Sequence, residues 1–137
     1  SIVRIAEEAG NAILTVYNRA GEIQVSSKQD ASPLTEADLI AHETIRDELL
    51  GIDETIPIVS EEGRIGNPLE SEKAWLVDPL DGTKEFIKRN GMFTVNIALM
   101  SRDNDRWTPI LGVVHAPVTK TTWVGGSETP PQRIAGT

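Results

Sequence analysis

The chain contains no cysteine, which excludes a disulfide framework, a thiol nucleophile and a cysteine-ligated zinc site. Aromatic residues are scarce, at 4% of the chain, and the two histidines have no histidine partner at metal-ligand spacing. No apolar run approaches the roughly 20 residues of a membrane-spanning helix. Basic side chains number 13 against 21 acidic ones, so we expect no nucleic-acid polymer as a partner.

The remaining composition is that of a globular protein. Hydrophobic residues make up 39% of the 137 residues, and the formal net charge is −8. A chain of this length forms about one domain and buries about two-thirds of its unfolded surface. The acidic excess has two interpretations: it keeps the protein in solution, or some carboxylates face one another across a bound cation. The positions of the acids decide between these interpretations.

Apolar periodicity predicts two helices near the N-terminus. The first starts at Ile2 and ends near Gly21, and the second runs from about Thr35 to Gly51, since both repeat apolar residues at helical spacing. The segment Thr35-Glu-Ala-Asp38 fits a capping box in which Asp replaces Glu. Asp38 therefore has a simple interpretation as a helix-capping acid.

Short apolar segments predict strands, one between the two helices and the others after the second helix. The expected strands are 23–25, 56–60, 74–77, 94–100, 109–115 and 121–124. We expect a short helix at 84–88, a hairpin turn at Asp103–Asp105, and loops at 26–33, 63–72 and 125–137. Without a repeating strand–helix–strand rhythm, the fold class is α+β, with two helices packed on a mostly antiparallel sheet.

Three acidic residues follow predicted strands. Glu61 comes directly after one strand and Asp78 after another, and Asp81 lies beyond a proline-containing turn. If the two strands are neighbours, these carboxylates meet at one edge of the sheet and repel one another unless a cation lies between them. Such oxygen ligands, with the Leu80 carbonyl as a further one, suit Mg²⁺ or Mn²⁺ rather than zinc.

The residues after this turn suit an anion. Gly82 and Thr83 lie where a helix begins, and free N–H groups at a helix start bind phosphate. Cation ligands beside a phosphate cradle are what metal-assisted hydrolysis of a phosphate ester needs. Asp, Gly and Pro also dominate ordinary surface turns, and the turn alone favours neither interpretation. An aspartyl-phosphate nucleophile turn of the form Asp-x-Asp-x-Thr would need an acid at position 79, which is proline, and this disfavours that covalent route.

Three segments in order resemble the motifs of the inositol monophosphatase superfamily of lithium-sensitive, magnesium-dependent phosphatases. They are Lys28-Gln-Asp-Ala-Ser-Pro-Leu-Thr-Glu-Ala-Asp38, Ser60-Glu-Glu62 and Trp75-Leu-Val-Asp-Pro-Leu-Asp-Gly-Thr-Lys-Glu-Phe86. Within the superfamily, Lys84-Glu85, Phe93-Thr-Val-Asn-Ile-Ala98 and Gly112-Val-Val-His-Ala-Pro117 are similar to bacterial bisphosphate nucleotidases.

The resemblance implies a set of metal ligands. Glu61, Asp78 and the Leu80 carbonyl would hold one Mg²⁺, and Asp78 and Asp81 would share a second. A complete site in the superfamily holds two or three ions.

The resemblance also implies catalytic and substrate-binding residues. Gly82 and Thr83 would donate backbone N–H groups to the phosphate. The Thr83 hydroxyl, oriented by Asp38, would help to position and deprotonate the attacking water, and Glu61 belongs to the same catalytic group. The expected substrate- and phosphate-binding residues are Glu61, Leu80, Asp81, Gly82 and Thr83.

Other polar residues are weaker candidates. Glu62 is either a neighbour of the ligands or a solvated acid, and Lys28 is a lone loop lysine of the kind that is usually solvated. We expect His42 and His115 to be surface or packing residues, and the three tryptophans to lie in the core or at sheet edges.

The function implied by the resemblance is a Mg²⁺-dependent phosphomonoesterase in the cytoplasm that converts adenosine 3′,5′-bisphosphate to AMP and phosphate; peripheral association with the inner membrane stays open. An inositol or sugar phosphatase is the alternative within the superfamily. A non-catalytic metal- or phosphate-binding module is the alternative of another class. The sequence does not indicate an oligomeric state.

The superfamily's C-terminal Trp-Asp motif does not occur in residues 1–137. We therefore expect an N-terminal α+β metal- and phosphate-binding domain, the N-terminal half of a layered αβαβα fold. By itself this half should bind Mg²⁺ weakly and have little activity.

Overall fold

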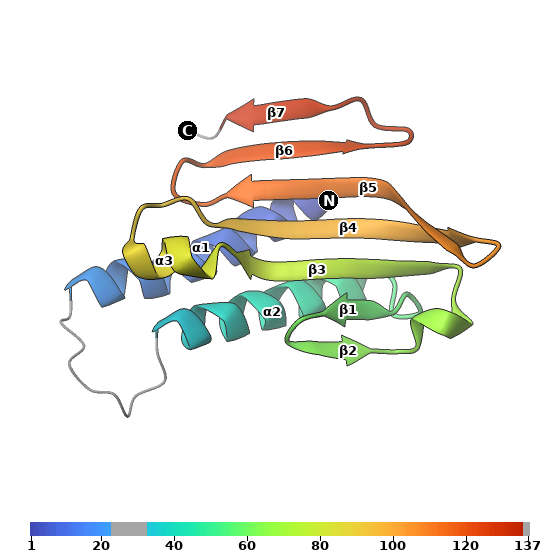
Figure 1. Cartoon of the computed structure of the whole chain (residues 1–137), viewed down its shortest axis with the longest axis horizontal. Helices are drawn as coiled ribbons and strands as arrows, with labels where there is room; N and C mark the ends of the chain where they lie inside the picture. Colours follow the sequence, from blue (N-terminus) through green and yellow to red (C-terminus); the bar gives the residue numbers. More distant parts are fainter. Residues whose placement is uncertain (23–32, 136–137) are drawn as a thin grey trace.

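Two long helices lie side by side against one face of a seven-stranded sheet (Figure 1). The computed structural model describes residues 1–22 and 33–135. The strand predicted at 23–25 and the candidate Lys28 lie outside the described residues. No helix in the described part of the chain is both long and apolar enough to cross a membrane.

The helices are α1 (Ile2–Glu22) and α2 (Pro33–Ile52). Each buries residues at i and i+4 spacing, which places them on one helical face. The fully buried residues of these stripes are Ile5, Ala9, Ile13, Ala37, Ala41, Ile45 and Leu49. Both predicted helices are therefore confirmed, and their apolar faces form half of the core.

The second helix begins two residues before the predicted start near Thr35. α2 begins at Pro33, so Thr35 lies inside the first turn and cannot be the N-cap of a capping box with Asp38. Proline is well suited to this place, because its fixed φ matches the helix and its missing N–H would have no helical partner there.

The strands appear in the sheet in the order β2-β1-β3-β4-β5-β6-β7. Their bounds are β1 (Ile58–Ser60), β2 (Gly63–Ile65), β3 (Lys73–Asp81), β4 (Thr94–Asp103), β5 (Arg106–Ala116), β6 (Thr121–Gly126) and β7 (Gln132–Ala135). Every neighbouring pair is antiparallel except β1 and β3, which are parallel. The mostly antiparallel α+β architecture is therefore confirmed.

Two segments predicted as loops contain regular structure. Residues 63–72 include β2 and a short 3₁₀ helix, η1 (Pro68–Glu70), and residues 125–137 include β7. Both strands lie at the edges of the sheet, and every residue of β7 is exposed. A short edge strand with no buried face has no apolar alternation, because only its backbone pairing with the next strand defines it.

The predicted hairpin turn at Asp103–Asp105 is confirmed, since β4 ends at Asp103 and β5 begins at Arg106. Asn104 and Asp105 have φ angles of 49° and 66°. Two successive residues with positive φ match the twist of a tight β-hairpin, and Asn and Asp tolerate that conformation best after glycine.

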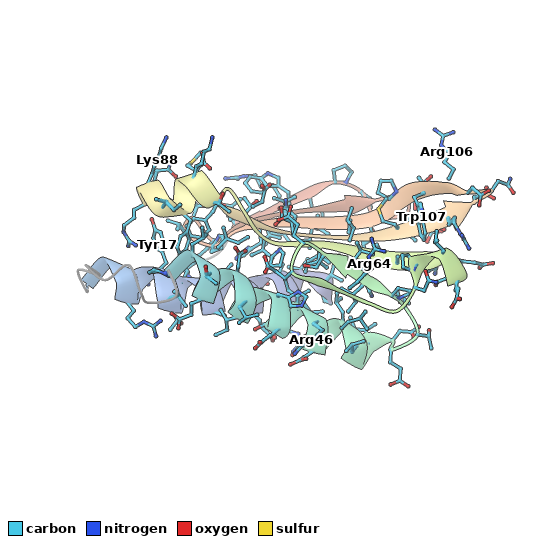
Figure 2. The ribbon with its side chains drawn as sticks, turned by 60° about the horizontal axis from the view of Figure 1, so that its bottom comes forward. Tyr17, Arg46, Arg64, Lys88, Arg106 and Trp107 are labelled. Carbon is cyan, nitrogen blue, oxygen red and sulfur yellow. The ribbon has the colours of Figure 1, made fainter. Side chains whose placement is uncertain are left out.

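An aromatic cluster attaches the short helix α3 (Thr83–Lys88) to α1. The rings of Tyr17, Phe86 and Phe93 pack with centroids 5.0 to 5.3 Å apart. Figure 2 shows Tyr17 rising from α1 toward α3, with Lys88 on the outer side of α3. Because α3 follows β3 directly, this packing holds the end of β3 against the helical layer.

Candidate metal and phosphate site

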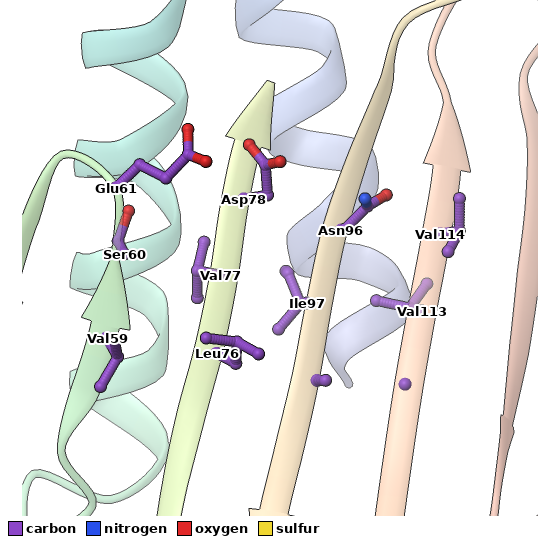
Figure 3. A pocket seen from close by; sticks show the side chains of 12 residues that line it. Val59, Ser60, Glu61, Leu76, Val77, Asp78, Asn96, Ile97, Val113 and Val114 are labelled. Carbon is purple, nitrogen blue, oxygen red and sulfur yellow. The ribbon is translucent and has the colours of Figure 1, made fainter. Parts of the chain in front are cut away.

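Glu61 and Asp78 lie side by side on two neighbouring strands. In the parallel pair of β1 and β3, Ser60 lies opposite Val77, so Glu61, which directly follows the end of β1, lies beside Asp78 in β3. Figure 3 shows the two carboxylates directed into the same space. The condition on which their meeting depended, that the two strands are neighbours, is therefore met.

A β-bulge brings Asp81 onto the same face as Asp78. Asp78 pairs with Asn96 and Asp81 with Thr94, so β3 advances three residues while β4 advances two. In an unbroken strand, residues three apart point to opposite faces, and the extra residue of a bulge restores the same face. The turn predicted after Asp78 is thus a bulged continuation of β3.

The bulge itself contains Pro79 and Leu80, whose side chains are buried. A proline fits there because it has no N–H to contribute to the ladder. Leu80 packs its side chain into the core. The role of its carbonyl as a cation ligand remains a prediction.

Gly82 joins the bulge to α3, and only glycine suits its conformation. Its φ of 100° and ψ of 53° lie in the left-handed region, and a Cβ there would stand 3.2 Å from Cα of Phe93. The Gly82 carbonyl accepts the first helical bond from the N–H of Phe86, at 3.0 Å. The helix start predicted at Gly82 and Thr83 is therefore present.

Asp38 faces the strand ends from α2. Burial, followed by the charges of Glu62, Asp78 and Glu61, raises the pKa of Asp38 from 3.8 to about 6. Since Asp38 lies more than a turn inside α2, helix capping does not account for it. Asp38 and Thr83 do not hydrogen-bond to each other in the described part of the chain, and the role of Asp38 in orienting the Thr83 hydroxyl remains a prediction.

Asp78 lies at the centre of this acidic group. Burial raises its pKa above the usual value, Glu61 and Asp81 raise it further, and a backbone hydrogen bond from Leu80 offsets part of the rise. Its Oδ1 atom is buried and has no hydrogen-bond partner among the described residues. A buried oxygen of this kind is unfavourable unless something positive meets it.

The oxygen-only donors fit a hard cation such as Mg²⁺. Within residues 1–22 and 33–135, however, no three Asp, Glu, His or Cys side chains stand close enough together to hold an ion. Like charges repel and stand apart when no cation lies between them. Mg²⁺ also keeps several of its waters, which bridge gaps that carboxylates do not close.

A cavity of about 540 Å³ lies over the face of the sheet away from the helices, which run behind the strands in Figure 3. Glu61, Asp78 and Asn96 form its polar end, and Leu76 and Val114 belong to its apolar wall (Figure 3). A cavity with carboxylates at one end and apolar side chains along its wall suits a ligand that carries a charged group on a larger molecule.

Asn96 is the site residue that sequence reasoning did not single out. Its Nδ2 atom donates to Oδ2 of Asp81 at 3.1 Å, and it lies directly opposite Asp78. The signal was available in the alternation of β4, where Thr94 and Asn96 are polar and Val95 and Ile97 are buried.

The weaker candidates are distributed around and away from the site. Glu62 acts on Asp38 through its charge, which places it near the acidic group. His42 and His115 are buried polar residues, and Nδ1 of His115 is 2.7 Å from Oγ1 of Thr122. Trp75 is buried in the core, as expected for a packing aromatic.

Comparison with solved structures extends the fold assignment. CysQ from Bacteroides thetaiotaomicron superposes with a TM-score of 0.78 and 41% identity, over 96% of this chain and 46% of that protein. An IMPase from Thermotoga maritima has a TM-score of 0.75 over 96% of this chain and 48% of that one, and at 23% identity it supports the fold alone.

The sequence comparisons agree with the structural ones. The chain is 52% identical over 119 residues to the 3′(2′),5′-bisphosphate nucleotidase CysQ of Escherichia coli O157:H7, which covers 85% of this chain and 47% of that protein. The chain thus spans about half the length of the curated relatives it matches. Residues 2–129 match the model of the inositol monophosphatase family, and the chain therefore belongs to this family.

Proposed function

We propose that the protein is a Mg²⁺-dependent phosphomonoesterase that removes the 3′-phosphate of adenosine 3′,5′-bisphosphate, giving AMP and phosphate. The observation that carries the proposal is the buried, unpartnered Oδ1 of Asp78 among neighbouring carboxylates, one bulge away from Gly82 and Thr83. The substrate follows from the relatives named as bisphosphate nucleotidases. Adenosine 3′,5′-bisphosphate is an intracellular nucleotide, so the proposal includes a cytoplasmic location for the protein.

In this proposal Glu61, Asp78 and the Leu80 carbonyl hold one Mg²⁺, and Asp78 and Asp81 share a second, with two or three ions in the complete site. When bound, the ions neutralise the phosphoryl oxygens and make a water more acidic. Support comes from the adjacent positions of Glu61 and Asp78 and from the bulge that turns Asp81 to their face.

The chain's own groups bind the phosphate and orient the nucleophile. The backbone N–H groups of Gly82 and Thr83 donate to phosphate oxygens, while the Thr83 hydroxyl positions the water. Asp38 orients that hydroxyl and accepts a proton at its carboxylate. Burial and the charge of Glu62 contribute to the raised pKa of Asp38 in the metal-free protein, and this carboxylate therefore lies close to the acidic group.

The test is phosphate release from adenosine 3′,5′-bisphosphate by the complete natural protein. Asp78→Asn and Asp81→Asn should each abolish the activity. Asp103→Asn is the matched control, because Asp103 is an exposed carboxylate at the far end of β4. Full activity in either site variant would refute the assigned ligands.

The same assay separates the alternatives. Inositol 1-phosphate is offered in competition with the nucleotide, and a higher kcat/KM for the inositol ester would support an inositol or sugar phosphatase instead. Direct Mg²⁺ binding without hydrolysis of either ester would support a non-catalytic module.

A further inference from the structure

Three side chains on one face of the sheet form a directed chain of hydrogen bonds. Oγ1 of Thr94 donates to Oδ1 of Asn96 at 3.0 Å, and Nδ2 of Asn96 donates to Oδ2 of Asp81 at 3.1 Å. The direction is fixed by chemistry, because an ionised carboxylate only accepts hydrogen bonds and so must face the NH₂ group of the amide.

The bulge explains why Asp81 needs such a partner. Asp81 is exposed at the last position of β3, immediately after the break in register between Asp78 and Asp81. An exposed side chain at the end of a strand keeps its rotamer freedom, which has to be lost when it binds an ion. Asn96 lies opposite Asp78, and its side chain reaches across the bulge. It restricts the rotamers of Asp81 before an ion binds.

An amide is the side chain that can do this without disturbing the charge of the site. The site already holds the carboxylates of Glu61, Asp78 and Asp81, and the charges of Glu61 and Asp81 act on Asp78. A further carboxylate at position 96 would add to that repulsion, and an ammonium group would compete with the cation. The amide contributes a neutral donor to one carboxylate oxygen and leaves the other free.

We propose that Asn96 is a positioning residue that holds the Asp81 carboxylate on the Asp78 side of the bulge and thereby orders the oxygen ligands for the cation. Thr94 supports it by fixing the orientation of the amide. The inference rests on the proposed Mg²⁺ site and adds residues that act on a ligand without touching the reacting atoms.

The experiment measures Mg²⁺ binding directly, by calorimetric titration of the metal-free complete protein in the absence of substrate. Asn96→Ala should weaken the affinity about tenfold, as is typical of residues that orient metal ligands. Thr94→Val should weaken it about threefold, in keeping with the loss of one neutral hydrogen bond. The control Ser101→Ala, at the opposite end of β4, should leave it unchanged.

A kinetic measurement separates positioning from a general structural loss. The Asn96→Ala variant should need more Mg²⁺ for half-maximal activity, while kcat at saturating Mg²⁺ stays within about twofold of the wild type. A fall in kcat that excess Mg²⁺ does not restore would contradict the proposal. If Asn96→Ala does not fold, as judged by circular dichroism, Thr94→Val decides alone.

The inference and the proposed function can fail separately. Unchanged Mg²⁺ affinity in the folded variants, with an active wild type, overturns the role of Asn96 and leaves the nucleotidase proposal standing. A wild type that binds Mg²⁺ but hydrolyses no nucleotide overturns the function, while the ranking of the variants still tests Asn96. A wild type that binds no Mg²⁺ overturns the inference.

Discussion

The guanidinium of Arg89 contacts Tyr17 both through a hydrogen bond and over its aromatic ring. Its Nη1 atom donates to the backbone carbonyl of Tyr17 at 2.9 Å, and its central carbon lies 4.0 Å from the centre of the Tyr17 ring. Arg89 ends α3, the helix that begins at Thr83 in the candidate site. One side chain therefore ties the far end of that helix to α1.

The first prediction concerns this contact. Arg89→Ala should lower the free energy of unfolding by about 1–3 kcal/mol, because it removes a charged hydrogen bond and a cation–π contact. Arg89 has a φ of 58°, so Arg89→Gly loses the same contacts but relieves the backbone, and it should be about 1 kcal/mol more stable than the alanine variant. Urea denaturation measures both, and an alanine variant as stable as the wild type would contradict the prediction.

The second prediction concerns Gly82. Gly82→Ala should destabilise the protein by about 1–2 kcal/mol, since a Cβ is unfavourable in the left-handed region, and it should lower the affinity for inorganic phosphate. The control is Gly51→Ala, because Gly51 lies in α2 and an added Cβ there meets nothing within 4 Å. In thermal unfolding, the melting temperature of the control should equal or exceed that of the wild type. Equal melting temperatures for the two variants would show that position 82 tolerates a side chain.

The third prediction concerns Asp38, whose pKa in the folded protein is raised from 3.8 to about 6. Between these values the folded state binds more protons than the unfolded state, so stability increases as the pH falls from about 6 to 4. At pH 7.5 the ionised group is unfavourable, and Asp38→Asn should stabilise the metal-free protein by about 1 kcal/mol after allowance for solvent screening. The same variant should lose phosphatase activity.

Thermal melts of the metal-free protein at pH 4.5 and pH 7.5 check the direction of this pH dependence. The stabilisation by Asp38→Asn should be larger at pH 7.5 and small at pH 4.5. An Asp38→Asn variant that is less stable at pH 7.5 would mean that the carboxylate contributes to folding.

The fourth prediction concerns His115. Burial lowers its pKa below the ordinary 6.5, with a smaller lowering by Lys120 and an opposing effect of Glu7. Below pH 6.5 the unfolded state then binds the extra proton, so this histidine removes stability as the pH falls. The space around it is tight, because a Cβ at Gly10 would lie 2.7 Å from its Cδ2 atom.

Replacing His115 with glutamine tests this behaviour. The difference in unfolding free energy between the wild type and the variant should shrink as the pH is lowered from 7.5 to 5, as measured by urea denaturation at each pH. His42→Gln, in α2, provides the histidine control. A difference that does not change with pH would show that His115 has the same pKa in the folded and unfolded states, contrary to the prediction.

Local patterns in the chain predict much of this fold. The i and i+4 repetition in Ile5 to Val16 and in Ala37 to Leu49 defines both helices, because it depends only on the helical period. The pair Asn104 and Asp105 marks the tight turn for the same local reason. In contrast, β7 is formed by backbone pairing with β6, which no side-chain pattern records.

The sequence by itself determined that Glu61, Asp78 and Asp81 follow strand-forming segments and that Gly82 starts a helix. Only the tertiary structure decided that Asp81 shares a face with Asp78 and that Asn96 holds it there. Side-chain alternation assigns faces only along an unbroken strand, and a bulge shifts that alternation by one residue. Whether the shift occurs depends on the register of the neighbouring strand, which is a property of the assembled sheet.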